Sequence, residues 1–483
     1  MHPIHSKVFL LALHLISLYP AKLVAQNVGI GTNSPHASAQ LDVVSSNKGL
    51  AIPSMTTAQR NAIVTPKAGL FVYDTNMQTL CMFNGSNWVY FQSSVLPNIV
   101  HPMEQVASDG VVGDQFGFSV AIDGNYAIIG APLDDIGANG DQGSAYIFFF
   151  NGTTWVEQAK LSAVGGEASD NFGSSVAISG DYAIVGAPRD NVGANSDQGS
   201  AYIFIRSGTT WTQQSNFSGN SATADDRFGS SVSIDGIYAA IGAPNDDVGA
   251  NTNQGTAYVF VRSGVNWTQQ DYKTLPSGAA NDEFGRSVSI SGIFLAVGAP
   301  NDEQPGGNNE GSIHVFERAG TSWSHFQEII FVNSDDSHFG YSVSVSGNYM
   351  AVGAPGDFGT PDFGRGQSYR YNGSTWLPAN INWLSSMPGV NSEFGDQFGL
   401  SVGVGGNNLI VGAPSTDTLG TQSGKSFLYQ TDGSSFYYVR EVIDPVGGAF
   451  HSMGTSVAAT AGHVLSGSPY ANGQRGKVLF LKL

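Results

Sequence analysis

Residues Asn171–Pro188 read NFGSSVAISGDYAIVGAP, and most of the chain is organised around copies of this stretch. Its two apolar runs, Ser-Val-Ala-Ile and Tyr-Ala-Ile-Val, flank a tight turn at Gly180. This pattern predicts a β-hairpin, because glycine tolerates the left-handed backbone that short hairpin turns need. The stretch ends in Gly-Ala-Pro, and we expect pairing to stop there because proline has no N–H to donate.

The same stretch recurs along the chain. Phe-Gly pairs begin at Phe116, Phe172, Phe228, Phe284, Phe339 and Phe398, with Met453-Gly454 as a degenerate seventh. Their spacings are 56, 56, 56, 55, 59 and 55 residues. Such a regular period indicates repeated supersecondary units.

Each unit divides into four predicted strands, A to D. Strand A follows Phe-Gly, strand B runs into Gly-Ala-Pro, and strand C follows a glycine at 143, 199, 255, 311, 366, 424 or 476. Strand D begins at Trp155, Trp211, Trp267, Trp323, Trp376 or Phe436. Four antiparallel strands per unit are typical of a propeller blade, and no unit shows helical periodicity. The predicted fold class is therefore all-β, a seven-bladed β-propeller with its small-residue A strands innermost.

The seventh unit lacks a strand D, because only KVLFLKL follows Gly476. An unpaired edge strand would be a liability. Upstream of the first repeat, Ile99–Val106 falls where strand D falls in the other units. We predict that this segment completes blade seven and closes the ring.

The N-terminus reads as an export signal. An apolar run at Val8–Leu18 follows Lys7, and small residues precede Gln26, so we predict a signal peptide at 1–25. The mature chain would begin at about Gln26 and be secreted or held at the cell surface. The predicted domains are a small module at 26–97 and the propeller at 98–483.

The N-terminal module does not share the repeat. It contains predicted strands at Gly69–Asp74, Thr79–Phe83 and Trp88–Phe91, and a short helix capped by Thr56 or Thr57. Its pattern VGIGT…P…LDV…KG…MTTAQR.AI…GL.VYDT…FNG..W resembles a module of bacterial secreted and tail-fibre-like proteins. The resemblance implies attachment and a possible homo-oligomer. Cys81 is the single cysteine and we expect it to pack as a hydrophobe.

The repeat pattern FG.SVAI.G.YAI.GAP…QG.AY.F…W is similar to the FG-GAP repeat of the integrin α-chain propeller, in its bacterial secreted variant. The resemblance implies extracellular recognition or adhesion. Integrin-type repeats often carry a calcium loop between strands A and B. Here that turn holds two or three residues, as at Gly124 and Gly180, so those metal sites do not carry over.

The chain carries 38 acidic against 20 basic residues, a net charge of −18. This excess argues against nucleic acid as a partner. Strand polarity places the B–C and D–A loops on one face and the A–B and C–D turns on the other. The B–C loops are rich in acids, the D–A loops place Asp114, Asp170, Asp226, Asp282 and Asp396 two residues before Phe, and Arg206, Arg262 and Arg318 lie beside the C–D turns. We therefore predict an acidic loop face.

Two groups of candidate site residues follow. Carboxylates of the first two B–C loops could hold calcium: Asp134, Asp135, Asp141, Asp190 and Asp197. Acids and aromatics that break the repeat in and after blade 5 could bind a ligand: Asp357, Phe358, Asp362, Phe363 and Trp383. The alternative for both groups is structural, since Asp caps turns and aromatics cover blade edges.

The sequence predicts a recognition or adhesion module that binds an extracellular protein or glycan through the loop face. The alternatives are a structural spacer without a ligand and an extracellular hydrolase or lyase. No nucleophile motif or paired-histidine metal spacing is present, so we predict no enzyme and no cofactor, with calcium as the one ion to test.

Overall fold

The computed structural model describes residues 28–30, 41–43, 45, 50–56, 59–60, 62–75, 79–83, 85, 88–91, 102–303, 309–330, 337–356, 364–384, 395–417, 421–433, 435–444 and 448–483. By its internal contacts the chain divides into two units, Met1–Ile99 and Val100–Leu483. The predicted signal peptide lies outside the described residues. No helix in the described part is long and apolar enough to cross a membrane.

The N-terminal unit is mostly β. It contains a parallel pair, β1 (Val28–Ile30) with β2 (Leu41–Val43), and one sheet in the order β3 (Ser54–Met55), β4 (Leu70–Asp74), β5 (Thr79–Phe83) and β6 (Trp88–Phe91). The three predicted strands are confirmed to within one residue. The predicted cap is also present, because Thr56 Oγ1 accepts the Gln59 N–H at 3.3 Å and Gln59 Oε1 accepts the Thr56 N–H at 2.9 Å.

A buried ion pair holds this small sheet together. Arg60 Nη1 lies 3.0 Å from Asp74 Oδ2, and their side chains are 2% and 0% exposed. Cys81 Sγ accepts a hydrogen bond from the same guanidinium at 3.4 Å. Cys81 is buried, as expected for a cysteine that packs as a hydrophobe.

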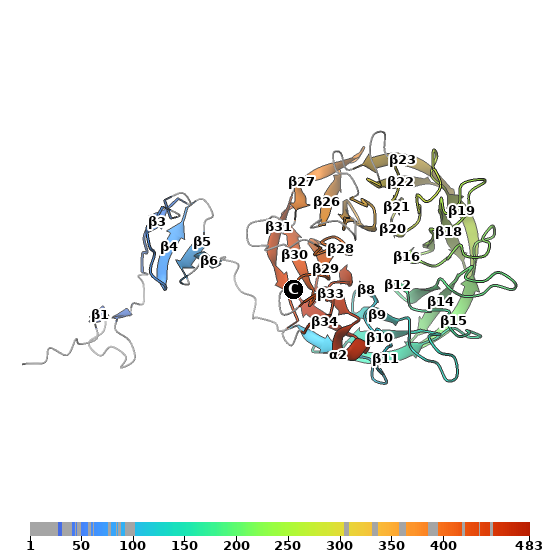
Figure 1. The fold of residues 1–483 in the computed structure, drawn as a ribbon, viewed down its shortest axis with the longest axis horizontal. Coiled ribbons are helices and arrows are strands. Elements are labelled where there is room, and N and C mark those ends of the chain that lie inside the picture. The colour runs from blue at the N-terminus through green and yellow to red at the C-terminus, as the bar shows by residue number, and fades with distance from the viewer. Residues whose placement is uncertain are drawn as a thin grey trace, which may run out of the picture. The chain divides into compact units, whose positions relative to one another are not determined.

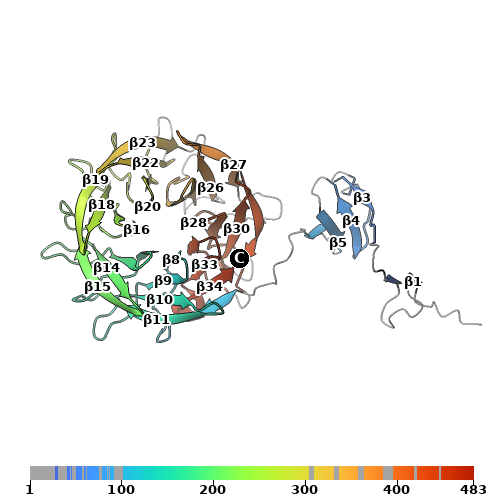
Figure 2. The same cartoon turned by 180° about the vertical axis from the view of Figure 1, so that it is seen from behind.

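The second unit is a ring of seven four-stranded antiparallel blades (Figures 1 and 2). The A strands are β8 (Ser119–Asp123), β12 (Ser175–Ser179), β16 (Ser231–Asp235), β20 (Ser287–Ser291), β24 (Ser342–Ser346), β28 (Val402–Gly405) and β32 (Ser456–Ala459). The B strands are β9 (Tyr126–Ala131), β13 (Tyr182–Ala187), β17 (Tyr238–Ala243), β21 (Phe294–Ala299), β25 (Tyr349–Ala354), β29 (Asn408–Ala413) and β33 (His463–Ser468).

The C and D strands complete the blades on the outside. The C strands are β10 (Ser144–Phe150), β14 (Ser200–Ser207), β18 (Thr256–Ser263), β22 (Ser312–Ala319), β26 (Arg365–Tyr371), β30 (Lys425–Thr431) and β34 (Lys477–Lys482). The D strands are β11 (Trp155–Leu161), β15 (Thr210–Phe217), β19 (Asn266–Lys273), β23 (Ser322–Ile330), β27 (Trp376–Leu384), β31 (Phe436–Val442) and, in blade 7, β7 (Met103–Gln105). A short helical turn, α2 (Ala471–Gln474), lies between β33 and β34.

The ring is closed by its N-terminal strand. Met103, Glu104 and Gln105 pair antiparallel with Phe480, Leu479 and Val478. The prediction that the segment upstream of the first repeat completes blade seven is confirmed for these residues. The segment closes the ring because it supplies the D strand that the C-terminus lacks.

The A strands are innermost and the D strands outermost, as Figure 1 shows for β12 and β15. The apolar core lies between blades, since each cluster joins two neighbours. Ile147 of blade 1, for example, packs in one cluster with Phe172 and Trp211 of blade 2. Every Phe of a Phe-Gly pair is at most 1% exposed. These phenylalanines therefore anchor each blade to the one before it.

The repeated glycines and serines also join the blades. A Cβ on Gly186 of Gly-Ala-Pro would lie 2.0 Å from the Gly229 carbonyl oxygen of the next blade, so only glycine fits. A serine at the start of strand A, or directly before it in blade 6, donates to the equivalent carbonyl in every blade over 2.7–2.9 Å: Ser119 to Gly173, Ser175 to Gly229, Ser231 to Gly285, Ser287 to Gly340, Ser342 to Gly399, Ser401 to Gly454 and Ser456 to Gly117. The motif is thus an inter-blade joint.

One predicted position is wrong. The glycine before strand C of blade 5 is Gly364, not Gly366. Gly364 has φ +73, and a Cβ on it would lie 2.3 Å from the Phe398 carbonyl oxygen, as in the other blades. Gly366 lies inside β26. The sequence misled because both glycines fit the spacing, and only the backbone contact separates them.

Candidate functional site

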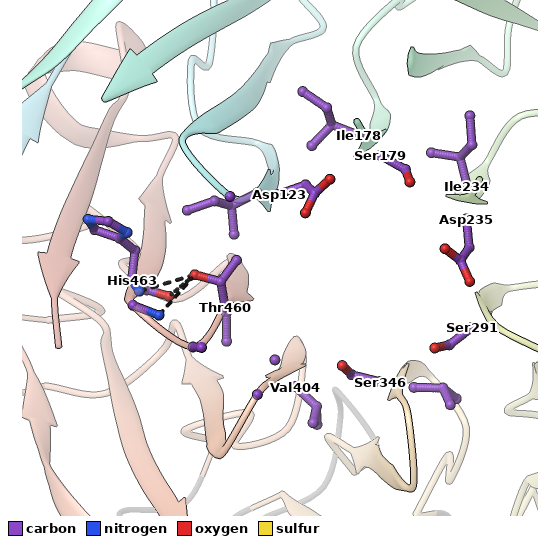
Figure 3. Close-up of a pocket in the computed structure, with 18 of the residues that line it drawn as sticks. Asp123, Ile178, Ser179, Ile234, Asp235, Ser291, Ser346, Val404, Thr460 and His463 are labelled. Atoms are coloured by element: carbon purple, nitrogen blue, oxygen red, sulfur yellow. Dashed lines mark hydrogen bonds between the residues drawn. The ribbon is translucent and has the colours of Figure 1, made fainter. Parts of the chain in front are cut away.

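The axial channel has a different lining at each end. At the turn face, which carries the A–B and C–D turns, a cavity of about 700 Å³ is lined by the inner turns (Figure 3). Side chains of one turn accept the N–H of the next turn's glycine: Asp123 from Gly180 at 2.7 Å, Ser179 from Gly236 at 3.2 Å, Asp235 from Gly292 at 2.6 Å and Ser291 from Gly347 at 3.2 Å. These groups join the blades, so we assign this end a structural role.

The arginines beside the C–D turns are also inter-blade contacts. Arg206, Arg262 and Arg318 each lie over a tyrosine ring of the preceding blade, at 4.2, 4.4 and 4.5 Å from the ring centre. Each also donates to the carbonyl of its own turn glycine. They sit beside the turns as predicted, and they stack on aromatic rings there.

The loop face carries the B–C and D–A loops. Two of its candidate calcium ligands are held by side chains of their own blade. Asp134 Oδ2 lies 2.7 Å from Lys160 Nζ and accepts from Tyr146 at 3.1 Å. Asp190 Oδ2 accepts from Tyr202 at 2.7 Å.

The other three candidates shape the B–C loops. Asp135 Oδ1 accepts the Asp141 N–H at 2.9 Å, and Asn191 Oδ1 accepts the Asp197 N–H at 3.0 Å. Asp141 and Asp197 have φ values of 53° and 48°, a left-handed backbone that Asp and Asn tolerate. Among the described residues, none of the five predicted calcium ligands lies in a cluster of three or more possible metal ligands.

The aspartates two residues before Phe are buried. Asp114 and Asp282 accept the backbone N–H of Val111 and Ala279, each at 2.6 Å, and so fold the D–A loop. Burial raises the pKa of Asp170, Asp226 and Asp282 to about 6, against the opposing backbone hydrogen bonds. The predicted acidity of this face therefore overstates its exposed charge, since sequence does not reveal which carboxylates are covered.

The predicted ligand-binding residues are mostly outside the described part of the chain. Asp357, Phe358, Asp362 and Phe363 fall within residues 357–363, which are not described. Trp383 lies in β27, opposite Gly366 in the strand register. The blade 5 site stays a prediction.

A second cavity lies at the axis of the loop face, and we call it the arginine recess. Its volume is about 570 Å³, and it is lined by Phe118, Asn171, Ser174, Pro188, Arg189, Arg227, Ser230, Arg286, Tyr341, Gln397, Leu400, Thr455 and Tyr470. The residues that follow Phe-Gly in all seven blades lie in this lining. Three lining residues are arginines, contributed by the loops and strand starts of blades 2 to 4. No carboxylate of the described residues lines the recess.

The three guanidiniums have no ion-pair partner among the described carboxylates. Arg189 and Arg227 are exposed. Arg286 is half-buried, donates to the Tyr341 hydroxyl at 2.6 Å and lies 4.7 Å from that ring's centre. Burial lowers the pKa of Arg286, but Tyr341 and Glu283 outweigh it, so the pKa ends above its ordinary value. The recess therefore presents positive charge and planar donors.

The arginine recess was not predicted, although one position of the repeat pointed to it. Within the repeat, the residue after Phe-Gly changes from blade to blade, as Phe118, Ser174, Ser230, Arg286, Tyr341, Leu400 and Thr455, while its neighbours repeat. A position that varies between fixed neighbours is not needed for blade packing. In a ring, these positions meet at the axis.

Comparison with known proteins identifies both units. Residues 29–108 match a family model described as a phage tail like trimerisation region. No curated protein matches the chain. A chain from a solved structure titled "Crystal Structure of Mitotic Checkpoint Complex" is similar at 10% identity and a TM-score of 0.47, over 82% of this chain and 98% of that one.

The repeat model matches more of the chain. The FG-GAP repeat is found at residues 104–148, 155–204, 211–260, 267–316, 332–371 and 391–429. The seventh blade, where Met453 replaces Phe, is not among these segments. The matched segments cover more than half of the sequence, and the chain belongs to the FG-GAP repeat family.

Proposed function

We propose that this protein is a secreted or cell-surface recognition module that binds an anionic glycan in the arginine recess. The observation that carries the proposal is the lining: three arginines without a described acidic partner, beside Tyr341 and Tyr470, at the axis of the loop face. Guanidinium groups bind carboxylate and sulfate in a planar, bidentate way. Tyrosine rings suit the apolar faces of sugars and supply hydroxyl donors.

Binding fits the recess better than catalysis. Among the described residues, its lining holds no carboxyl group and no histidine, which are the commonest general acids and bases, and Tyr341 lies against the Arg286 guanidinium. A recess of about 570 Å³ also has the size of a ligand pocket. We therefore propose a non-catalytic module, in place of a hydrolase or a spacer without a ligand.

We also propose that the N-terminal unit makes a homotrimer. The family model matched there is described as a trimerisation region. On β4, Phe71 and Tyr73 point to one side and are 40% and 37% exposed, while Val72 and Asp74 point inward. Three propellers on one trimer would raise the avidity for a polymeric glycan.

Calorimetry on the full chain tests the site. The probes are a heparin-derived sulfated oligosaccharide, an oligogalacturonate and a neutral maltooligosaccharide. We expect the charged probes to bind, the neutral one not to bind, and affinity to fall with salt. Arg286→Ser should weaken binding about tenfold or more, since a hydrogen bond to a charged group contributes about 1.5–3 kcal/mol.

The Arg286→Ser variant should fold like the wild type, because Ser174 and Ser230 occupy the equivalent position in blades 2 and 3. Arg475→Gln is the control, since it removes an exposed charge outside the recess lining. Equal affinity for wild type and Arg286→Ser would reject the recess. Binding of an acidic peptide but of neither charged glycan would reject the glycan as ligand.

A further inference from the structure

Blade 4 departs from blades 1 to 3 at a position that contacts a buried aspartate. In blades 1 to 3 a tyrosine of strand C donates to the B–C loop aspartate: Tyr146 to Asp134 at 3.1 Å, Tyr202 to Asp190 at 2.7 Å and Tyr258 to Asp246 at 2.7 Å. In blade 4 the tyrosine is replaced by His314, and the aspartate is Asp302. An imidazole therefore stands where a phenol stands elsewhere.

The cross-strand neighbour changes as well. Opposite the strand C tyrosine lie Lys160, Asn216 and Tyr272 in blades 1 to 3. In blade 4 the residue opposite His314 is Glu328. Ligand atoms of Asp302, His314 and Glu328 lie within 4.8 Å of one another. Three residue types that bind metals thus converge on β22, β23 and the B–C loop.

Blade 1 shows that a cation can occupy the equivalent place. There Lys160 Nζ lies 2.7 Å from Asp134 Oδ2. Blade 4 keeps the aspartate but has a carboxylate in place of the lysine. The local charge in blade 4 is therefore negative. A metal ion from solution would take the place that the Lys160 ammonium group has in blade 1.

A second histidine orients the first. His314 Nδ1 lies 3.1 Å from His325 Nε2, and His314 Nε2 lies 3.9 Å from Asp302 Oδ2. If His314 donates its Nδ1 proton to His325, Nε2 carries the lone pair, which an ion would take in place of the Ser312 hydroxyl proton. Ser312 Oγ lies 3.1 Å from the same Nε2, and its equivalent in blade 1, Ser144, donates to Asp134 instead.

The site is also accessible. His314 is 3% exposed and Asp302 is 9% exposed, whereas Glu328 and His325 are exposed. A buried imidazole and carboxylate with an exposed carboxylate above them can take an ion directly from solution. The ligand set is one imidazole nitrogen and two carboxylates, and Zn²⁺ binds both of these ligand types. Calcium would need six to eight oxygens.

We propose that Asp302, His314 and Glu328 bind a divalent transition-metal ion, with Zn²⁺ as the first candidate, and that His325 is a positioning residue. This site is separate from the arginine recess, since none of its residues lines that cavity. It differs from the predicted calcium ligands in blade and in chemistry. The internal repeat reveals it, because only blade 4 makes all of these replacements.

Zinc calorimetry on the full chain tests the proposal. We expect the wild-type protein to bind Zn²⁺ from ZnCl₂, and we expect His314→Tyr to abolish this binding. Glu328→Asn should weaken the site about tenfold or more, and His325→Gln should weaken it about tenfold through the lost orienting bond. CaCl₂ at the same concentration should give no comparable heat.

The variants are chosen so that folding is retained. His314→Tyr restores the tyrosine–aspartate pair of the other blades, and Asn216 occupies the position of Glu328 in blade 2. Glu303→Gln is the control, because Glu303 is an exposed acid next to Asp302 in the sequence. A His314→Tyr protein that melts like wild type and binds as much zinc would overturn the proposal. Wild-type protein that binds no zinc, or binds calcium better, would also overturn it.

Discussion

At the scale of single residues, the repeat motif is explained by contacts between blades. Gly186 must be glycine because the next blade's carbonyl lies where its Cβ would be. Ser175 donates to that same carbonyl. The sequence predicted a β-hairpin here, and the antiparallel pairing of β12 with β13 confirms it. It did not predict that the aspartate two before Phe is buried, because burial depends on how the D–A loop folds over it.

Burial of Asp170, Asp226 and Asp282 predicts a pH dependence of stability. Their pKa values of about 6 in the folded state exceed the ordinary aspartate value of 3.8. The folded state therefore binds protons more tightly, and the free energy of unfolding rises as pH falls from about 7.5 towards 4. The triple Asp→Asn variant should be more stable than wild type at about pH 7.5, by about 1–3 kcal/mol per site.

The comparison is a pair of thermal melts at about pH 7.5 and pH 5. We expect the difference in Tm between the variant and wild type to shrink at the lower pH. Histidine titration affects both proteins equally, so the difference isolates the aspartates. A difference that stays constant, or grows on acidification, would contradict the buried-carboxylate explanation.

At the scale of elements, each blade is a four-stranded sheet that cannot bury its faces alone. The clusters between blades supply that burial, as where Phe148 of blade 1 packs near Phe480 of blade 7, with ring centres 6.0 Å apart. The last blade depends on β7, which comes from the other end of the ring sequence. Register alone predicted this strand, because an open C strand needs a partner.

Deleting Ile99–Val106 should therefore abolish cooperative folding. The deletion removes β7 and leaves the edge of β34 unpaired, which opens the ring at blade 7. Circular dichroism and calorimetry should show a broad transition at a Tm lowered by several degrees or more. A second deletion, of residues 92–97, is the length control, and this variant should melt like the parent. The same sharp transition in both deletions would count against closure by this strand.

At the scale of the whole molecule, pseudo-symmetry separates scaffold from candidate site. Positions that repeat in every blade build the joints, and positions that break the repeat gather at the axis of the loop face and in blade 4. The sequence shows which positions vary between blades, but it does not show that the three arginines of the recess lie together. Arg189, Arg227 and Arg286 belong to blades 2, 3 and 4, and the closed ring brings them to one recess.

The proposed trimer gives a test at this scale. Light scattering on the full chain should give about three times the chain mass of 50.6 kDa, less any signal peptide removed. Phe71→Ser with Tyr73→Ser should give monomer, because it removes the exposed apolar face of β4. The monomer should keep its affinity for a short oligosaccharide and lose about a hundredfold in apparent affinity for the polymer.

Tyr272→Ser is the matched control, since Tyr272 is 57% exposed on the propeller. It should leave the trimer intact. A wild-type monomer would reject the trimer, and a trimeric double variant would reject β4 as its contact surface.

The number of blades, the order of their strands and the segment that closes the ring could all be predicted from the sequence. These features follow from period, turn residues and side-chain size, which are local and repeat. Which charged groups are buried, stacked on rings or brought together is seen in the folded structure alone. It buries Asp170 and Asp226, stacks Arg206 on a ring, and leaves Arg227 and Arg286 facing one recess. Burial of Asp170 and Asp226 depends on how each D–A loop folds over its own carboxylate. The stacking of Arg206 and the convergence of the arginines arise from contacts between blades about 56 residues apart, which no local pattern records.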